Sequence, residues 1–166
     1  MRKVAIILGS DSDLAVAEKC VPVLSRLEIP YEVRVISAHR SPEKAREFAL
    51  NARSDNVGVI IAIAGKSAAL SGMLAAHTRL PVIGVPVRSD DFCGMDALLS
   101  TVQMPPGIPV ACVAVGGGEN SAFLAARILA VDDDELLRRL DDEAVRMSER
   151  VDVKDNEIRA KYGQIC

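Results

Sequence analysis

Residues 57–64, VGVIIAIA, decide the fold class of this chain, because they comprise seven apolar residues and one glycine. A strand with one face in water alternates apolar and polar residues, whereas an uninterrupted apolar run is typical of a strand buried on both faces. Further strands are predicted at 4–8, 31–37, 81–87 and 109–116, with helices at 12–27, 42–53, 67–78, 94–102 and 119–130. Five consecutive strand–helix units predict an α/β protein with a three-layer, flavodoxin-like, doubly wound parallel sheet.

The character of the sequence changes near residue 132, where a highly charged segment of helical period begins. We therefore predict an α/β catalytic domain over 1–131 and a C-terminal helical extension over 132–166. An apolar stripe is expected along the extension, formed by Leu136, Leu137, Leu140, Ala144 and Met147. The extension is either a solvated tail or a helix that packs on a neighbouring subunit. The apolar stripe favours the second alternative, in which the extension is part of an oligomer interface.

The composition excludes several classes of protein. A formal net charge of −3 disfavours a nucleic-acid partner, because such binding needs a basic face. No apolar run reaches the roughly 18 residues of a membrane span, and the short N-terminal run suits a first strand rather than a signal peptide, so a cytoplasmic protein is expected. Four cysteines without ligand spacing and only two histidines predict no metal site. Cys20 and Cys112 are expected to be small buried hydrophobic residues.

Chemistry is expected directly after each strand, because ligands of open parallel sheets bind outside the carboxyl ends of the strands. Ser10 and Asp13 follow the first strand, where they can cap a helix or hold a ligand's hydroxyl groups. Ser37, His39 and Arg40 follow the second strand. Arginine offers a fork of donors suited to phosphate, and histidine gains and loses a proton near neutral pH.

The third strand ends in a turn of small residues that lets a ligand approach the backbone. Its GKS tripeptide does not form a phosphate-binding P-loop, because the glycine that this motif needs five positions earlier is Ile60. Residues 86–89 and the loop 90–94 follow the fourth strand, and residues 116–120 form a flexible turn after the fifth. His77 falls at the end of a predicted helix, where a basic residue is ordinary.

These residues by themselves predict a site for a phosphorylated small molecule with one proton-transferring histidine. Neither a Ser-His-Asp set nor an aromatic platform is evident, since the chain has no tryptophan and two tyrosines. A non-catalytic, flavodoxin-like module that binds a flavin or another nucleotide remains an alternative. The shortage of aromatic residues to stack on a flavin disfavours it.

Several longer motifs resemble one enzyme family. They are GSDSD (9–13), SAHR-x-P (37–42), AG-x-x-x-x-L-x-GM (64–73), LPVIGVPV (80–87), LLSTVQMPPGIPV (98–110) and AARILA (125–130). Together they are similar to the carboxyaminoimidazole ribonucleotide mutase / phosphoribosylaminoimidazole carboxylase family of purine biosynthesis, over about residues 4–140. The resemblance implies a product with a carboxylate on ring carbon 4 of aminoimidazole ribonucleotide, and a homo-oligomer, with an octamer as first choice.

The resemblance also implies roles for individual residues. Ser10 and Asp13 would bind the nucleotide, Arg40 with Ser37 would hold its phosphate, and His39 would be the catalytic acid and base. The Ala64–Gly65 backbone and Leu70 would build a dry pocket for carbon dioxide. No cofactor is expected, because the amino-imidazole is an enamine whose ring carbon 4 is already nucleophilic.

The carboxyl donor distinguishes two branches of the family. The mutase branch, which moves the carboxylate from the exocyclic nitrogen, is expected to carry AGGAAHLPGM, whereas this chain has AGKSAALSGM with Ala69 in place of the histidine. A basic residue and serine after AG are similar to the carboxylase branch, although SAHR is mutase-like. We therefore expect direct carboxylation with carbon dioxide, with Lys66 and Ser67 as donors to the developing carboxylate, and retain the mutase as the alternative.

Overall fold

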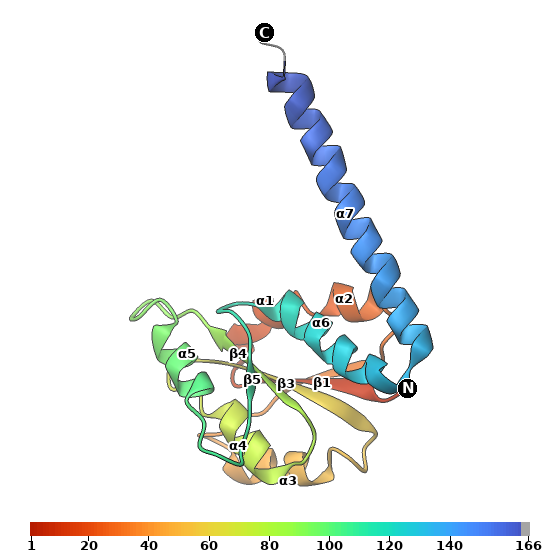
Figure 1. The fold of residues 1–166 in the computed structure, drawn as a ribbon. Coiled ribbons are helices and arrows are strands. Elements are labelled where there is room, and N and C mark those ends of the chain that lie inside the picture. Colours follow the sequence, from red (N-terminus) through yellow and green to blue (C-terminus); the bar gives the residue numbers. More distant parts are fainter. Residues whose placement is uncertain (164–166) are drawn as a thin grey trace.

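The computed structural model describes residues 1–163, which fold around a five-stranded parallel sheet (Figure 1). The strands are β1 (Lys3–Leu8), β2 (Tyr31–Val35), β3 (Val57–Gly65), β4 (Val82–Val87) and β5 (Ala111–Cys112). Their order in the sheet is β2-β1-β3-β4-β5, which is the flavodoxin-like order. The predicted fold class is therefore confirmed, and the order of the strands reverses between β1 and β3.

Helices cover both faces of the sheet (Figure 1). One face carries α1 (Leu14–Ala17), α2 (Val21–Arg26) and α6 (Gly118–Leu129), and the other carries α3 (Pro42–Asn51), α4 (Leu70–His77) and α5 (Met95–Val102). Successive side chains of a strand point to opposite faces. Val4, Ile6 and Leu8 accordingly pack in one core and Ala5 and Ile7 in the other. Two buried faces explain why β3 and β4 contain no polar side chain.

The prediction of one continuous helix over residues 12–27 is wrong. The chain instead forms a 3₁₀ turn, η1 (Asp11–Asp13), then α1, and after a break α2. Pro22 lies in the first turn of α2 and has no N–H to donate to the carbonyl of the preceding turn. A proline is tolerated at a helix start, so the helix restarts there.

The fifth strand is also shorter than the predicted 109–116. Only Ala111 and Cys112 pair with β4, opposite Ile83 and Gly84. Further along β4, Pro86 lacks the N–H that would continue the ladder, and it only accepts a hydrogen bond from the Gly116 N–H at 2.8 Å. At this edge Cys112 is half-buried, so the predicted burial holds for Cys20 and only in part for Cys112.

A 3₁₀ turn, η2 (Ala130–Asp132), leads into α7 (Asp134–Tyr162), whose second half projects from the body (Figure 1). The predicted apolar stripe is partly wrong, because Leu136 is buried whereas Leu137 and Met147 are exposed. The buried stripe continues instead to Glu143, which is 1% exposed. Its carboxylate is neutralised by the guanidinium groups of Arg26 at 3.1 Å, Arg146 at 3.3 Å and Arg150 at 3.4 Å.

Candidate active site

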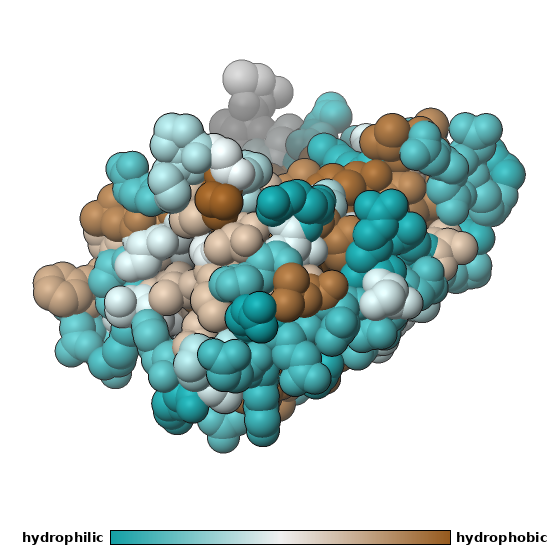
Figure 2. Space-filling model, turned by 90° about the horizontal axis from the view of Figure 1, so that it is seen from below, coloured by the Kyte–Doolittle hydropathy of each residue, from teal (hydrophilic) through white to brown (hydrophobic). Residues whose placement is uncertain are grey.

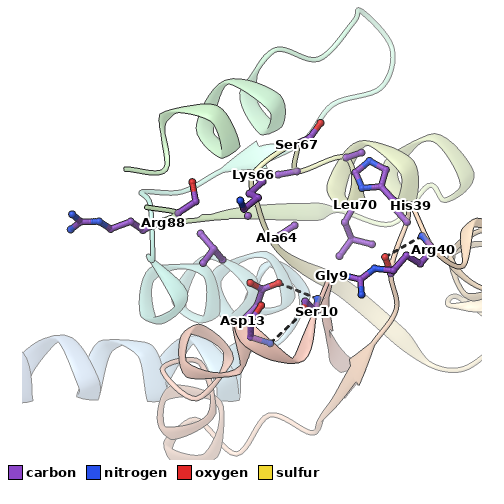
Figure 3. A pocket seen from close by; sticks show the side chains of 18 of the residues that line it. Gly9, Ser10, Asp13, His39, Arg40, Ala64, Lys66, Ser67, Leu70 and Arg88 are labelled. Carbon is purple, nitrogen blue, oxygen red and sulfur yellow. Dashed lines mark hydrogen bonds between the residues drawn. The ribbon is translucent and has the colours of Figure 1, made fainter. Parts of the chain in front are cut away.

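A cavity of about 580 Å³ opens at the carboxyl ends of β1, β3 and β4 and beside the turn after β2 (Figure 3). It lies at the point where the strand order reverses, as expected for a doubly wound sheet. All ten residues that the sequence nominates line it, namely Ser10, Asp13, Ser37, His39, Arg40, Ala64, Gly65, Lys66, Ser67 and Leu70. The structure thus brings the candidates together, whereas their individual roles stay predictions.

The turn after β1 is fixed by a reciprocal cap between Ser10 and Asp13. The Ser10 N–H donates to Oδ2 of Asp13 at 3.1 Å, and Oγ of Ser10 accepts from the Ser12 N–H at 3.4 Å. This capping box leaves the turn rigid at the edge of the cavity. For Asp13 the helix-capping and ligand-binding interpretations are therefore compatible, because the cap uses only Oδ2 of its carboxylate. The single hydroxyl oxygen of Ser10 takes part in the cap and also donates to Oδ1 of Asp11 at 3.0 Å.

Asp13 is buried, with 6% of its surface exposed. Burial raises the pKa of its carboxyl group, and the nearby charge of Asp11 acts in the same direction, while the hydrogen bond from the Ser10 backbone opposes them. A buried carboxylate without a cationic partner gains from hydroxyl or amino donors on a ligand. Asp13 is thus suited to binding the polar groups of a sugar or an amine.

The turn after β2 presents His39 and Arg40 to the cavity. The Arg40 N–H donates to Oγ of Ser37 at 3.2 Å, and the Ser41 hydroxyl donates to the Ser37 carbonyl at 2.9 Å. Figure 3 shows the Arg40 side chain extended toward the Gly9–Ser10 turn, and His39 on the side of Leu70. No carboxylate pairs with Arg40 within residues 1–163. An unpaired guanidinium group at the mouth of a cavity is suited to a phosphate.

The turn after β3 begins with a lysine in the left-handed region, since φ of Lys66 is 54°. The Ala68 N–H bonds to the Lys66 carbonyl at 2.9 Å and the Ala69 N–H to the Ser67 carbonyl at 2.7 Å. These two bonds keep the chain out of helical geometry, so α4 begins at Leu70 rather than at the predicted residue 67. Leu70 is buried and forms an apolar part of the wall, while the Ser67 hydroxyl points away from Asp13 in Figure 3.

The structure also adds residues from the segment after the fourth strand, for which the sequence predicted no individual role. Arg88, Ser89, Asp90 and Asp91 follow β4 and line the same cavity. The rule that places ligands after strand ends pointed to this loop, but no residue pattern singled out its members. The glycine-rich residues 116–120 and His77 do not line the cavity, and Nδ1 of His77 instead contacts the Met73 carbonyl at 2.9 Å.

Residues 1–163 contain no cluster of three or more metal-ligating side chains. In the same part of the chain, no helix has the length and apolar character that crossing a membrane requires. His39 is the one histidine that lines the cavity. The walls therefore provide a histidine, two guanidinium groups, an ammonium group and several carboxylates, a set suited to binding an anionic ligand and moving a proton.

The fold and the cavity define the class of protein. It is a doubly wound α/β protein that carries an anion-binding site and one acid–base group where the order of its strands reverses. Comparison with known proteins makes this specific. Residues 3–150 match the family model described as AIR carboxylase, so the chain belongs to the AIR carboxylase family. The family predicted from the motifs is confirmed, and with it an enzyme rather than a non-catalytic binding module.

Named relatives and solved structures agree with this assignment. The chain is 52% identical to an N5-carboxyaminoimidazole ribonucleotide mutase of Pyrococcus abyssi, over 84% of this chain and 80% of that protein. It is 48% identical to the protein of the same name in Haemophilus influenzae, over 93% and 94% of the two chains. The crystal structure of Treponema denticola PurE superposes with a TM-score of 0.85 at 32% identity, covering 94% of this chain and 98% of that one.

Proposed function

We propose that this protein is an enzyme of purine biosynthesis that moves a carboxylate from the exocyclic nitrogen of aminoimidazole ribonucleotide to ring carbon 4. The observation that carries the proposal is the high identity, over most of both chains, to relatives named N5-carboxyaminoimidazole ribonucleotide mutase. The direct carboxylation expected from the sequence is not confirmed by these relatives, which favour its alternative.

The reaction needs one group that both gives and takes a proton, and His39 is placed for this role. Cleavage of the carbamate releases carbon dioxide, and the exocyclic nitrogen takes up a proton. Ring carbon 4 then attacks the carbon dioxide and loses its own proton, so the two transfers cancel. A single histidine can therefore carry both steps, because it ends each turnover in the state in which it began.

The remaining side chains bind and orient the substrate. Arg40, with the Ser37 hydroxyl beside it, holds the phosphate, and Ser10 and Asp13 bind the ribose or the amine. Ala64, Gly65 and Leu70 form the apolar wall that retains the released carbon dioxide next to the ring. Keeping that small molecule within reach replaces an encounter in solution by an intramolecular step.

Direct carboxylation of aminoimidazole ribonucleotide by free carbon dioxide is the second candidate, and one specific observation favours it. Ala69 stands where the mutase motif is expected to have a histidine, and Lys66 and Ser67 precede it on the cavity wall. An ammonium and a hydroxyl group there suit the developing carboxylate. The geometry of the cavity is compatible with either donor.

One assay separates the two reactions, namely formation of the carbon-4 carboxylate from each donor. We expect turnover of the carbamate nucleotide in buffer depleted of carbon dioxide, at a rate that added bicarbonate does not change. Aminoimidazole ribonucleotide with bicarbonate should be converted much more slowly. A rate that rises with dissolved carbon dioxide, together with failure of the carbamate nucleotide as substrate, would establish direct carboxylation instead.

We also propose that the chain is a homo-oligomer, with an octamer as the expected state and the C-terminal helical extension as part of its interface. The second half of α7 projects away from the body of its own chain (Figure 1), and it carries Val151, Val153 and Ile158, each more than half exposed. Apolar patches also lie between charged side chains on the face drawn in Figure 2. Burial of such surface is the usual driving force of association.

The oligomer is tested by light scattering on the purified chain at micromolar concentration. We expect a mass several times that of one chain, and a smaller species when the chain is cut after Arg150. The shortened chain should keep its α/β domain folded, because residues 151–163 are all exposed and contribute nothing to the buried core. A stable monomer for the full chain would contradict the proposal.

A further inference from the structure

An ion pair joins two walls of the cavity. Nζ of Lys66, in the turn after β3, lies 2.9 Å from Oδ2 of Asp91, in the loop after β4, and both residues line the cavity. The strand ends below them are paired, since Gly65 lies opposite Val87. The ammonium group of Lys66 is thus paired across the cavity entrance, although 73% of the Lys66 side chain is exposed to solvent.

The backbone of Lys66 adopts an uncommon conformation at this entrance. A non-glycine residue with φ near 54° is uncommon, and such conformations persist where the surroundings hold them. Lys66 is one of two such residues in or beside this entrance, the other being Cys93 with φ 53°. Figure 3 places the Lys66 side chain between the end of β4 and the turn that carries Asp13.

The loop after β4 and the start of α5 carry three carboxylates, Asp90, Asp91 and Asp96, beside the single guanidinium group of Arg88. The hydrogen bond and the charge of Asp91 raise the pKa of Lys66, and the charges of Asp96 and Asp90 add to the effect. In return, Lys66 lowers the pKa of Asp91. Asp96 is held in place by the Ser89 hydroxyl, at 3.2 and 3.4 Å. Together with Arg88 of the same loop, Lys66 offsets this group of carboxylates at an entrance that an anionic nucleotide must pass.

An ammonium group has three donors, so a lysine that bonds to Asp91 keeps two donors for a ligand. Its four-carbon stem is flexible and loses rotamer entropy when it binds unless a partner already restrains it. We propose that Asp91 is a positioning residue, which holds the Lys66 ammonium where it binds the carboxylate that distinguishes the carboxylated nucleotide from aminoimidazole ribonucleotide. This inference rests on the proposed function and adds to it the pair of residues that selects for the carboxylate.

The test is the affinity for two nucleotides, 4-carboxy-5-aminoimidazole ribonucleotide and aminoimidazole ribonucleotide, measured by calorimetry. The full chain carries His39→Asn as a common background, so that neither ligand is consumed. Asp91→Asn is expected to weaken binding of the carboxylated nucleotide about fivefold, as for loss of a restrained, exposed ion pair, and to leave binding of the other nucleotide within about twofold. Lys66→Met should have the same selective effect, and adding Asp91→Asn to it should have no further effect.

Asp96→Asn is the matched control, because it removes the same charge near Lys66 without touching its ammonium group. Asp91→Glu should restore part of the selectivity, which a merely structural role of Asp91 would not require. An equal loss for both nucleotides, an effect of Asp96→Asn as large as that of Asp91→Asn, or additive losses in the double variant would overturn the inference.

An activity measurement on the wild-type chain, beside these binding measurements, keeps this inference separate from the proposed function. If the wild-type chain fails to convert the carbamate nucleotide but the binding selectivity depends on Asp91, the proposed reaction fails and the inference stands. If conversion is normal and the selectivity is unchanged, only the inference fails. Absence of binding by either nucleotide would overturn both.

Discussion

Replacing His39 by asparagine is expected to abolish turnover, with kcat reduced by about 10²- to 10⁴-fold, which is the usual contribution of a general acid–base group. Asparagine keeps the approximate size and polarity of the imidazole but cannot carry the proton between nitrogen and carbon 4. His39 is exposed at the cavity and makes no contact that the core depends on, so the fold should be unaffected. The measurement is steady-state conversion of the carbamate nucleotide, beside nucleotide affinity by calorimetry.

Nucleotide affinity should survive His39→Asn within roughly tenfold, or about 1.4 kcal/mol, because Arg40 is proposed to hold the phosphate, which does not react. His77→Asn is the matched control. It changes the other histidine of the chain, which lies outside the cavity, and full activity is expected. If His39→Asn retains more than a tenth of wild-type activity, another group transfers the proton.

Replacing Arg40 by alanine is expected to weaken nucleotide binding by about 2–3 kcal/mol, or roughly 30- to 150-fold. The guanidinium group has no carboxylate partner in the described chain, so its hydrogen bonds are free for the phosphate. Arg40→Ala leaves the backbone N–H that bonds to Ser37 in place, and the turn should keep its shape. Binding of the nucleotide and of its dephosphorylated nucleoside should be compared by calorimetry.

The nucleoside provides the control for this prediction. Its binding should be nearly the same in wild type and Arg40→Ala, because it lacks the group that Arg40 is proposed to hold. Arg88→Ala tests the opposite wall of the cavity, where a second guanidinium group contacts Sγ of Cys93 at 3.8 Å. Two outcomes would contradict the placement of the phosphate at Arg40. One is an equal loss of affinity for nucleotide and nucleoside in Arg40→Ala, and the other is a loss of affinity specific to the phosphate that occurs only in Arg88→Ala.

The fold was predictable from the sequence because a strand that is buried on both faces has an uninterrupted apolar sequence. Residues 57–64 contain no polar position, and the structure places them between two helical layers. Once five such units follow one another, right-handed crossovers restrict the order of the strands to few arrangements. The rule that ligands bind after the strand ends then sufficed to nominate His39 and Arg40.

The interruptions of the regular pattern depend on single residues, and the periodicity did not resolve them. Pro22 splits the first helix, and Pro86 ends the ladder between β4 and β5. Both residues act through a missing N–H, whose effect depends on which neighbour would have accepted the bond. For β5, that neighbour is defined only when the strands have been placed side by side.

The sequence by itself determined the class of fold, the family and the group of residues that lines the cavity, because each depends on local pattern and chain order. Only the tertiary structure decided which charges meet. The carboxylate of Glu143 lies under Arg26, which is 117 positions away, and Lys66 reaches Asp91 across the entrance, 25 positions away. Coulombic attraction depends on distance in space and on solvent exposure, and neither is encoded in the spacing of residues along the chain.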